Sequence, residues 1–327
     1  MANLHEPSAA GSAGTLPAGD TRRAAARARR SKLTPAQLEN RTAYLFLLPW
    51  FIGLITVTIG PVLVSLYLSF TRYNVLRPPR WIGLDNYVEM FTEDPQFWAA
   101  ARVTFFYVGW SVPLVLVVSL SVAALLNRGL SGLTIYRSIF YLPSLIGGSV
   151  AIGLLWREVF GSRGIFNNLL KLFGIAGRSW IASPDSAPWT LVALHLWTFG
   201  ASMVIFLAAL RQISPSLYEA ASIDGASAWT RFRRITLPLL TPVIFFNVIL
   251  LTIQSFQAFT QSFIVSNGTG GPADSTLLYT LYLYKRAFVQ LDMGYASAMA
   301  WILLIVIALF TALLFWSARF WVYYGDD

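Results

Sequence analysis

The sequence contains no cysteine among its 327 residues and only two histidines, His5 and His195. Disulfides, iron–sulfur clusters and thiolate metal sites are therefore excluded, and a histidine-built metal site nearly so. Charged residues make up 12% of the chain, about half the share of a typical soluble domain. The sequence also lacks the Gly-x4-Gly-Lys-Ser/Thr loop that holds nucleotide phosphates. Since 56% of the residues are hydrophobic, we expect a helical membrane protein.

Positive charge is concentrated ahead of the first apolar run, and the net charge is +9. A basic tail beside a membrane helix typically fixes topology by the positive-inside rule, so we expect a cytoplasmic N-terminus and no nucleic-acid partner. Residues 1–42 are rich in Ala, Gly, Ser and Arg, and we expect a disordered cytoplasmic tail rather than a signal peptide. The basic residues of this tail are Arg22, Arg23, Arg27, Arg29, Arg30, Lys32 and Arg41.

Six apolar segments are each long enough to cross a bilayer as a helix, so the predicted fold class is an all-α, polytopic membrane protein surrounded by lipid. Between the first two segments we expect an extracytoplasmic loop at 71–96. A core domain then covers 97–320 and includes a polar inner segment at 212–240, and residues 321–327 form a cytoplasmic tail. The expected spans are 43–70, 97–126, 138–160, 189–210, 241–265 and 295–316.

The polar segment around Tyr218–Pro242 is more elaborate than a simple turn requires. Ser214 suits a helix N-cap and Pro215 a first helical position, so we expect a helix to begin there. Gly225 suits the left-handed end of that helix. A second short helix should follow over about 226–236 and end at Pro238. The product is a helix–turn–helix on the cytoplasmic face, which would serve either to dock a partner or to lie in the membrane interface.

The fifth expected span carries a row of amides that lipid would disfavour. Their spacings of seven, three and four residues place them on one face of a helix. Polar side chains in a span usually face the bundle interior or a water-filled path, although they also bond helices together. Amides with aromatic neighbours suit a polyhydroxy substrate. The candidate pathway residues are Asn247, Gln254, Ser255, Phe256, Gln257 and Gln261.

The polar segment closely resembles the EAA loop of ABC importer permeases. The matching positions are Glu219, Ala220, Ala221, Asp224, Gly225, Ile235, Leu237 and Pro238. Four further runs resemble the carbohydrate-uptake branch of these permeases: Trp81–Tyr87, Tyr141–Pro143, Ser255–Phe259 and Met293–Ala298. The resemblance covers nearly the whole chain beyond the basic tail.

This resemblance implies a type I ABC importer permease fold, whose cytoplasmic coupling helix docks on an ATP-binding subunit. Glu219 would be the polar contact, Ala220 and Ala221 the close-packing surface, and Asp224 with Gly225 the turn. The chain would be a non-catalytic subunit without cofactor, because partner subunits bind the ATP. It would sit in the bacterial inner membrane with both termini cytoplasmic. The implied partners are a second permease in a heterodimer, two ATP-binding subunits and an extracytoplasmic solute-binding protein. The substrate would be a sugar, an oligosaccharide or a glycerol-phosphate-like solute.

Two other classes of membrane protein remain as alternatives. Ser149 with His195 suggests an intramembrane serine protease, but the protease motif needs glycine after the serine and Val150 follows here. An ion-coupled secondary transporter needs ionisable groups near the bilayer midplane. The fifteen carboxylates lie outside the expected spans or near their ends, with Glu158 as the nearest exception.

Overall fold

The computed structural model describes residues 35–128 and 132–323 of the chain. Most of the expected tail, residues 1–34, and the last four residues lie outside this description. Contacts divide the chain into two units, residues 1–63 and 64–327. The described residues are mainly helical, and the two strands among them, β1 (Thr71–Arg72) and β2 (Arg80–Trp81), form a short hairpin. The all-α fold class is therefore confirmed.

The first unit contains α2 (Pro35–Gly53) and the π-helical turn η1 (Leu54–Ile59), and it ends within α3 (Gly60–Ser69), whose last six residues belong to the second unit. The apolar part, Ala43–Ser69, is long and apolar enough to cross a membrane and coincides with the expected span at 43–70. Pro61 is the second residue of α3, so one residue, Gly60, separates it from the π-helical turn. Proline has no N–H and its ring crowds the carbonyl four residues earlier, so a wider turn before it lets the helix continue.

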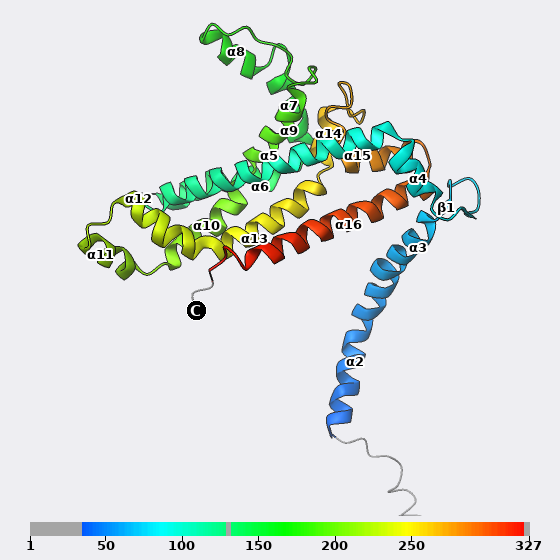
Figure 1. The fold of residues 1–327 in the computed structure, drawn as a ribbon, viewed down its shortest axis with the longest axis horizontal. Coiled ribbons are helices and arrows are strands. Elements are labelled where there is room, and N and C mark those ends of the chain that lie inside the picture. Colours follow the sequence, from blue (N-terminus) through cyan, green and yellow to red (C-terminus); the bar gives the residue numbers. More distant parts are fainter. Residues whose placement is uncertain (1–34, 129–131, 324–327) are drawn as a thin grey trace, which may run out of the picture. The chain divides into compact units, whose positions relative to one another are not determined.

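The second unit is a bundle built on three long helices (Figure 1). These are α5 (Pro95–Leu126), α13 (Leu237–Phe256) and α16 (Met293–Ala318), and α13 packs against both others. Next to them, α9 (Ala187–Trp197) and α10 (Gly200–Gln212) pack on α5. Buried apolar side chains fill the interior, among them Val112 of α5, Leu191 of α9 and Leu251 of α13.

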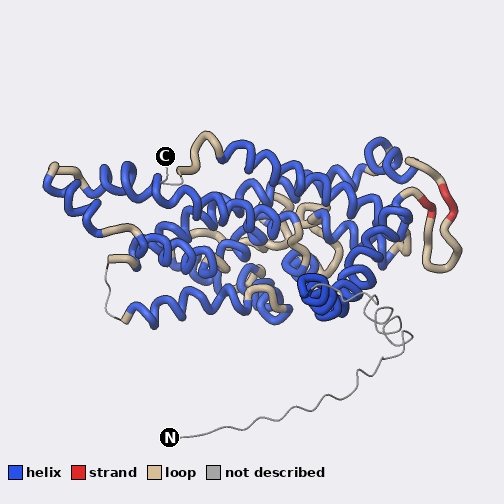
Figure 2. Tube along the Cα trace, turned by 90° about the horizontal axis from the view of Figure 1, so that it is seen from below, coloured by secondary structure: helices blue, strands red, loops and turns tan. Residues whose placement is uncertain are grey.

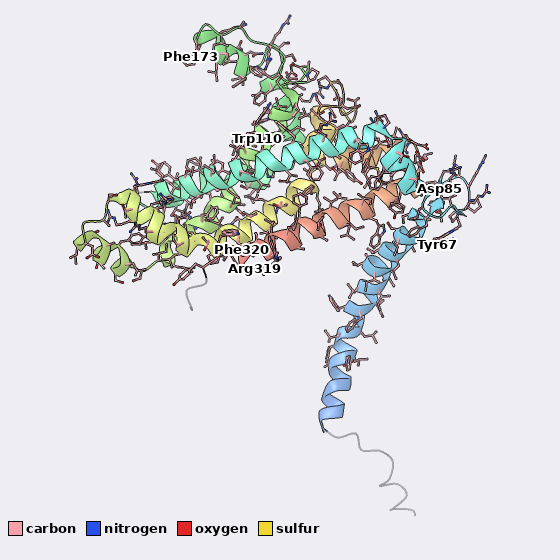
Figure 3. The ribbon with its side chains drawn as sticks, in the orientation of Figure 1. Tyr67, Asp85, Trp110, Phe173, Arg319 and Phe320 are labelled. Atoms are coloured by element: carbon pink, nitrogen blue, oxygen red, sulfur yellow. The ribbon has the colours of Figure 1, made fainter. Side chains whose placement is uncertain are left out.

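The two ends of this bundle carry different structures, as Figure 2 shows with the strands at one end only. The hairpin end holds β1, β2 and α4 (Asp85–Thr92), and it also holds α15 (Tyr279–Tyr284) with the π-helical turn η3 (Lys285–Val289). Asp85 marks it in Figure 3, where Arg319 and Phe320 mark the far end of α16. The opposite end holds α11 (Pro215–Ile223) and α12 (Ala228–Arg231) (Figure 1).

The third and fourth expected spans are bent. Each is a continuous apolar segment in the sequence, which did not predict a bend. The third consists of α6 (Leu133–Ile146) and α7 (Val150–Phe160), with a bend of 100° between α6 and the α7–α8 segment, where α8 is Ile165–Leu172. The fourth bends by 43° between α9 and α10. Counting each bent pair as one span, the described residues contain six candidate spans.

The two bends lie against each other, and this contact explains them. A Cβ on Gly147 would lie 2.2 Å from Thr198 Cγ2, so only glycine fits at this point of the third span. Ser144 Oγ donates to Thr198 O at 3.0 Å and accepts from Ala201 N at 2.9 Å. Its hydroxyl therefore satisfies backbone groups that the interruption of the fourth span sets free.

The fifth expected span is also interrupted, whereas the second and sixth coincide with the unbroken helices α5 and α16. The helix α13 ends at Phe256, and the short α14 (Thr260–Val265) follows after a break. Thr280 Oγ1 donates to Ala258 O inside this break. A carbonyl without a helical partner is thereby satisfied, which allows the chain to leave the helix here.

Candidate functional site

The polar segment forms the expected helix and left-handed turn at the α11 end of the bundle. Helix α11 begins at Pro215 and ends at Ile223, and Gly225 has φ of +74°. An L-residue with a side chain is strained in this region, so the turn requires glycine or a tolerant substitute. Ser214 occupies the N-cap position, but its hydroxyl bonds the Ser216 hydroxyl at 2.8 Å instead of a backbone amide.

The second helix of this segment does not end at Pro238, which corrects the expectation. It begins at Ala228 and continues through the π-helical turn η2 (Phe232–Thr236) into α13, giving an unbroken helix of 29 residues, Ala228–Phe256. Pro238 is the second residue of α13, so the wide turn precedes it as η1 precedes Pro61. The widened turn accommodates the proline ring, and the segment is joined rigidly to the bundle.

Two side-chain bonds fix α11 against the helix that follows. Tyr218 Oη lies 2.9 Å from Thr236 Oγ1, and Arg231 Nη1 donates to Ser222 Oγ at 2.7 Å. The surface that remains is solvent-accessible: Ala221 is half-buried, whereas the other four predicted coupling residues, Glu219, Ala220, Asp224 and Gly225, are exposed. Exposed apolar side chains adjoin them, namely Leu217, Ile223 and Trp229, and Ile223 is 88% exposed. Small, acidic and apolar groups thus share one accessible surface suited to a protein partner.

The predicted pathway residues do not form a single helical face, because α13 ends before two of them. Gln257 terminates α13, and Gln261 lies on the separate α14. Within α13 itself, Asn247 is buried and donates to Val243 O of its own helix at 2.9 Å. Gln254, by contrast, is exposed. The regular spacing was misleading since a face continues only as far as its helix.

The remaining two predicted pathway residues pack against α5. Ser255 Oγ is buried 3.4 Å from Ser111 Oγ, and the Phe256 ring meets that of Phe105 edge-on at 5.6 Å. Phe256 also lines an apolar cavity of about 290 Å³ with Trp98, Phe105 and other side chains. These residues therefore join α13 to α5, and the exposed amides Gln254 and Gln257 are the members of the set with free polar surface.

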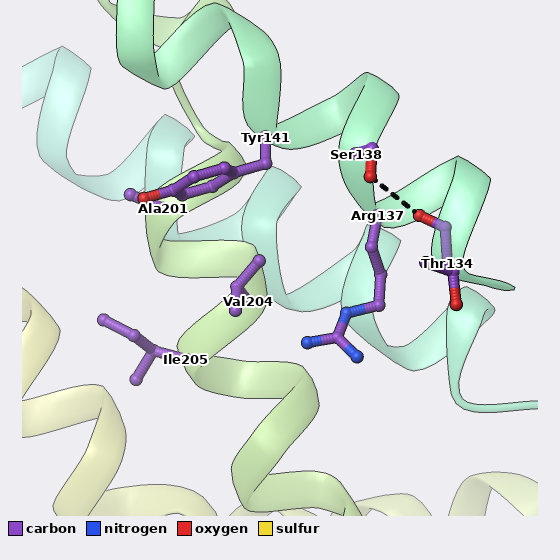
Figure 4. Close-up of a pocket in the computed structure, with 7 residues that line it drawn as sticks. All are labelled: Thr134, Arg137, Ser138, Tyr141, Ala201, Val204 and Ile205. Carbon is purple, nitrogen blue, oxygen red and sulfur yellow. Dashed lines mark hydrogen bonds between the residues drawn. The ribbon is translucent and has the colours of Figure 1, made fainter.

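A larger cavity of about 570 Å³ lies between α6 and α10 (Figure 4). Its α6 wall carries three hydroxyl-bearing side chains and the guanidinium of Arg137, and Ser138 Oγ donates to Thr134 O at 3.0 Å. Its α10 wall is apolar, from Ala201 to Ile205. None of the predicted pathway residues lines this cavity, which was not predicted from the sequence.

A cluster of charged and phenolic side chains at the hairpin end was also missed. Asp94 accepts hydrogen bonds from the hydroxyls of Tyr282 and Tyr295, both at 2.5 Å. Burial tends to raise the pKa of Asp94, but these bonds outweigh it and hold the pKa below its ordinary value. Asp94 followed by Pro95 ahead of an apolar run is a helix-start pattern, and this signal was present in the sequence.

Ser149 and His195 are not arranged as a nucleophile and its base. Ser149 caps α7, where its Oγ accepts from Ile152 N at 3.4 Å. His195 is buried with its ring centroid 5.7 Å from that of Tyr107, and its Nε2 has no hydrogen-bond partner among the described residues. The serine is thus used as a helix cap, which removes the basis for the protease alternative.

Comparison with known proteins decides the family. Residues 96–322 match the model of the binding-protein-dependent transport system inner membrane component family. The chain belongs to this family. It is 50% identical over 287 residues to the probable ABC transporter permease protein YesP of Bacillus subtilis (strain 168), covering 88% of this chain and 93% of that protein. The region that matches the family model, residues 96–322, contains the EAA loop and the bent spans. It also contains the hairpin-end cluster except for Glu89 and Asp94, which precede it.

The names of other relatives state a transport substrate. The lactose transport system permease protein LacF of Rhizobium radiobacter is 35% identical, over 84% of this chain and 93% of that protein. Among solved structures, a bacterial alginate ABC transporter in complex with an alginate pentasaccharide-bound periplasmic protein matches with a TM-score of 0.74. It is 24% identical, over 88% of this chain and 98% of that chain, so it supports the fold. The type I importer fold class and the multi-pass membrane character are therefore confirmed.

Proposed function

We propose that this protein is a permease subunit of an ATP-driven ABC importer for a sugar or oligosaccharide. The observation that carries the proposal is the exposed EAA segment at the α11 end, joined without a break to α13. Sugar-transporting relatives such as LacF support the substrate class. The chain forms one half of the translocation pathway, and a second permease subunit supplies the other half in a heterodimer.

The energy for transport comes from two partner ATP-binding subunits in this proposal. Their surface receives α11, with Glu219 as the polar contact and Ala220 and Ala221 as the close-packing surface. Gly225 keeps the turn narrow because its left-handed conformation reverses the chain within one residue. ATP binding would move the segment, and α13 would transmit this movement to the spans. Substrate arrives from an extracytoplasmic solute-binding protein at the hairpin end.

The orientation and the pathway follow from the same proposal. The basic tail, the α11 end and the C-terminus face the cytoplasm of a bacterial inner membrane. Gln254 and Gln257 contact the passing substrate, because their amides have free polar surface and exchange hydrogen bonds readily with sugar hydroxyls. The buried Asn247, Ser255 and Phe256 support these amides from within the bundle, and the half-buried Gln261 flanks them on α14.

Uptake measurements on turn variants test the coupling role. Gly225→Val places a β-branched residue at φ of +74° and should abolish uptake of a radiolabelled oligosaccharide while the protein remains in the membrane. Gly225→Asn is the matched control, since asparagine tolerates this conformation and should retain most of the uptake. Glu219→Lys should also stop uptake by reversing the charge of the contact. Wild-type uptake in both Gly225→Val and Glu219→Lys would contradict the proposal.

A further inference from the structure

One carboxylate at the hairpin end joins three helices. Asp94 Oδ1 accepts from Gln96 N at 2.9 Å and Phe97 N at 3.1 Å, so this oxygen caps the start of α5. Asp94 Oδ2 accepts from Tyr282 Oη of α15 and from Tyr295 Oη of α16. One oxygen thus bonds the start of α5, and the other bonds two neighbouring helices. Hydrogen bonds to an ionised acceptor are stronger than neutral ones.

A second layer of charges lies beside this carboxylate. Arg286 of η3 pairs with Glu89 of α4 at 2.7 Å and approaches Asp292 at 3.9 Å. Its guanidinium carbon also lies 3.7 Å from the centroid of the Tyr295 ring, whose hydroxyl is bonded to Asp94. By pairing with Glu89 and stacking on the Tyr295 ring, Arg286 therefore connects α4 to the hydrogen bonds around Asp94.

The hairpin is attached to the same cluster through backbone bonds. Asn74 forms an isolated antiparallel bridge with Asp292, and Gly294 N donates to Tyr73 O at 3.1 Å. Asn86 of α4 donates from one side chain to Ser69 O at 2.8 Å and Thr71 O at 3.0 Å. We call the connected set the hairpin-end block: residues 69–97 together with residues 279–299.

We propose that Asp94 is a positioning residue that holds the hairpin-end block together as one unit throughout the transport cycle. The arrangement is a permanent joint and not a gate, because opening it would strand a partly buried carboxylate and an arginine without their partners. Helix α13 ends at Phe256, and the break that follows separates it from α15. Movement that α13 brings from the α11 end is taken up at this break and does not separate α5 from α16.

A reversible cross-link across the block tests whether it stays closed. Since this chain has no cysteine, the variant Glu89→Cys with Arg286→Cys is labelled selectively within it, in a complex whose other subunits are made cysteine-free. A short bis-methanethiosulfonate reagent would join the two positions in the assembled complex in proteoliposomes. We expect cross-linked transporter to keep the uptake of the same variant before treatment. Loss of uptake on cross-linking, with recovery on reduction, would show that the block must open and would overturn the proposal.

Phenylalanine variants supply a second test that preserves the packing. Tyr282→Phe with Tyr295→Phe removes both hydroxyl donors to Asp94, and Asp94→Asn removes the charge that they stabilise. We expect the number of sugars transported per ATP to fall roughly tenfold in both, while ATP hydrolysis by the assembled complex continues. A purely structural role would lower the amount of assembled complex instead. If the double phenylalanine variant transports as many sugars per ATP as the wild type, the proposal is overturned. This second test decides by itself where the cysteine variant is already inactive before cross-linking.

Because this inference rests on the proposed function, wild-type uptake is measured first in the same vesicles. Failure of the wild-type complex to transport any sugar of a panel refutes the proposed substrate class. Failure confined to the outcomes above refutes the permanent joint alone. Tyr284→Phe is the control for the phenylalanine changes, since this tyrosine lies on the same helix with its ring 5.2 Å from that of Phe259. It should transport sugar at the wild-type ratio to ATP.

Discussion

Asn167 uses its whole side chain to hold the loop beyond α7 and α8. Its Nδ2 donates to Gly161 O, Ser162 O and Arg178 O at 2.7–3.1 Å, and its Oδ1 accepts from Trp180 Nε1 at 2.7 Å. The opposite face of α8 is exposed, so packing there does not hold the loop. This amide and the Phe166 ring, which packs against those of Phe160 and Trp180, therefore hold the segment together.

Replacing this amide should loosen the loop locally. Asn167→Ala removes the side-chain partner of several part-buried polar groups, which costs about 1–3 kcal/mol in local stability. We expect faster trypsin cleavage at Lys171 and Arg178 in proteoliposomes. The neighbouring exposed Asn168→Ala is the matched control and should be cleaved at the wild-type rate. Equal cleavage of the two variants would contradict the assignment.

The lowered pKa of Asp94 makes a prediction about pH. The group is ionised in the folded protein at lower pH than in the unfolded chain, so its stabilisation is complete above its ordinary pKa of about 3.9. This stabilisation is lost as the pH falls through the lowered value. The difference in melting temperature between wild type and Asp94→Asn should be constant from about pH 5 to 8 and shrink below about pH 4. A difference that changes between pH 6 and 8 would indicate another titrating group.

At the scale of elements, the π-helical turn η2 sets the angular relation between α12 and α13. Pro238→Ala restores an N–H and removes the ring that the wide turn accommodates, so the turn can tighten into regular α-helix. We expect α12 to rotate relative to α13 and uptake to fall severalfold, about 1 kcal/mol of coupling. Pro242→Ala is the control, because no wide turn precedes Pro242 within α13. Equal uptake in the two variants would contradict this role for η2.

Elements that depend on local chemistry were predictable from the sequence, and those that depend on contacts were not. The apolar length of α16 and the left-handed turn at Gly225 are properties of neighbouring residues, and both expectations were confirmed. The bend at Gly147 arises because Thr198, about fifty residues away, occupies the space of a Cβ. Likewise, α13 ends just before the break in which Thr280 donates to Ala258 O. The spacing of residues along the sequence does not predict this contact. The amide face was misjudged for this reason.

The candidate site divides in the same way. The predicted coupling residues lie within seven positions of one another, so their resemblance to the EAA loop was visible in the sequence without the fold. The hairpin-end cluster draws Glu89 and Asp94 together with Arg286 and Tyr295 from about 200 residues further along the chain. Of this cluster, only the N-cap pattern at Asp94 can be recognised in the sequence. The tyrosines that donate to Asp94 can be identified only from the structure.

For the whole molecule, the proposed topology places the α11 end and the C-terminus in the cytoplasm. A green fluorescent protein fused after Asp327 should therefore fluoresce, and alkaline phosphatase inserted after Gly174 should be active in intact cells. Changing the seven basic residues of the N-terminal tail to glutamine should lower the fraction of correctly oriented protein. Fluorescence lost and phosphatase active at the C-terminus would reverse the proposed orientation.

The unbroken helix from Ala228 to Phe256 has a consequence for side-chain direction. Its 29 residues extend roughly 40 Å, and a continuous helix transmits twist as well as displacement. Turning α12 about its own axis would turn Gln254 through a similar angle at the far end. The two states of the transporter would then differ in which amide faces the passing sugar, in addition to how wide the passage is. Selectivity would be a property of the cycle, with different side chains presented to the solute on entry and on release.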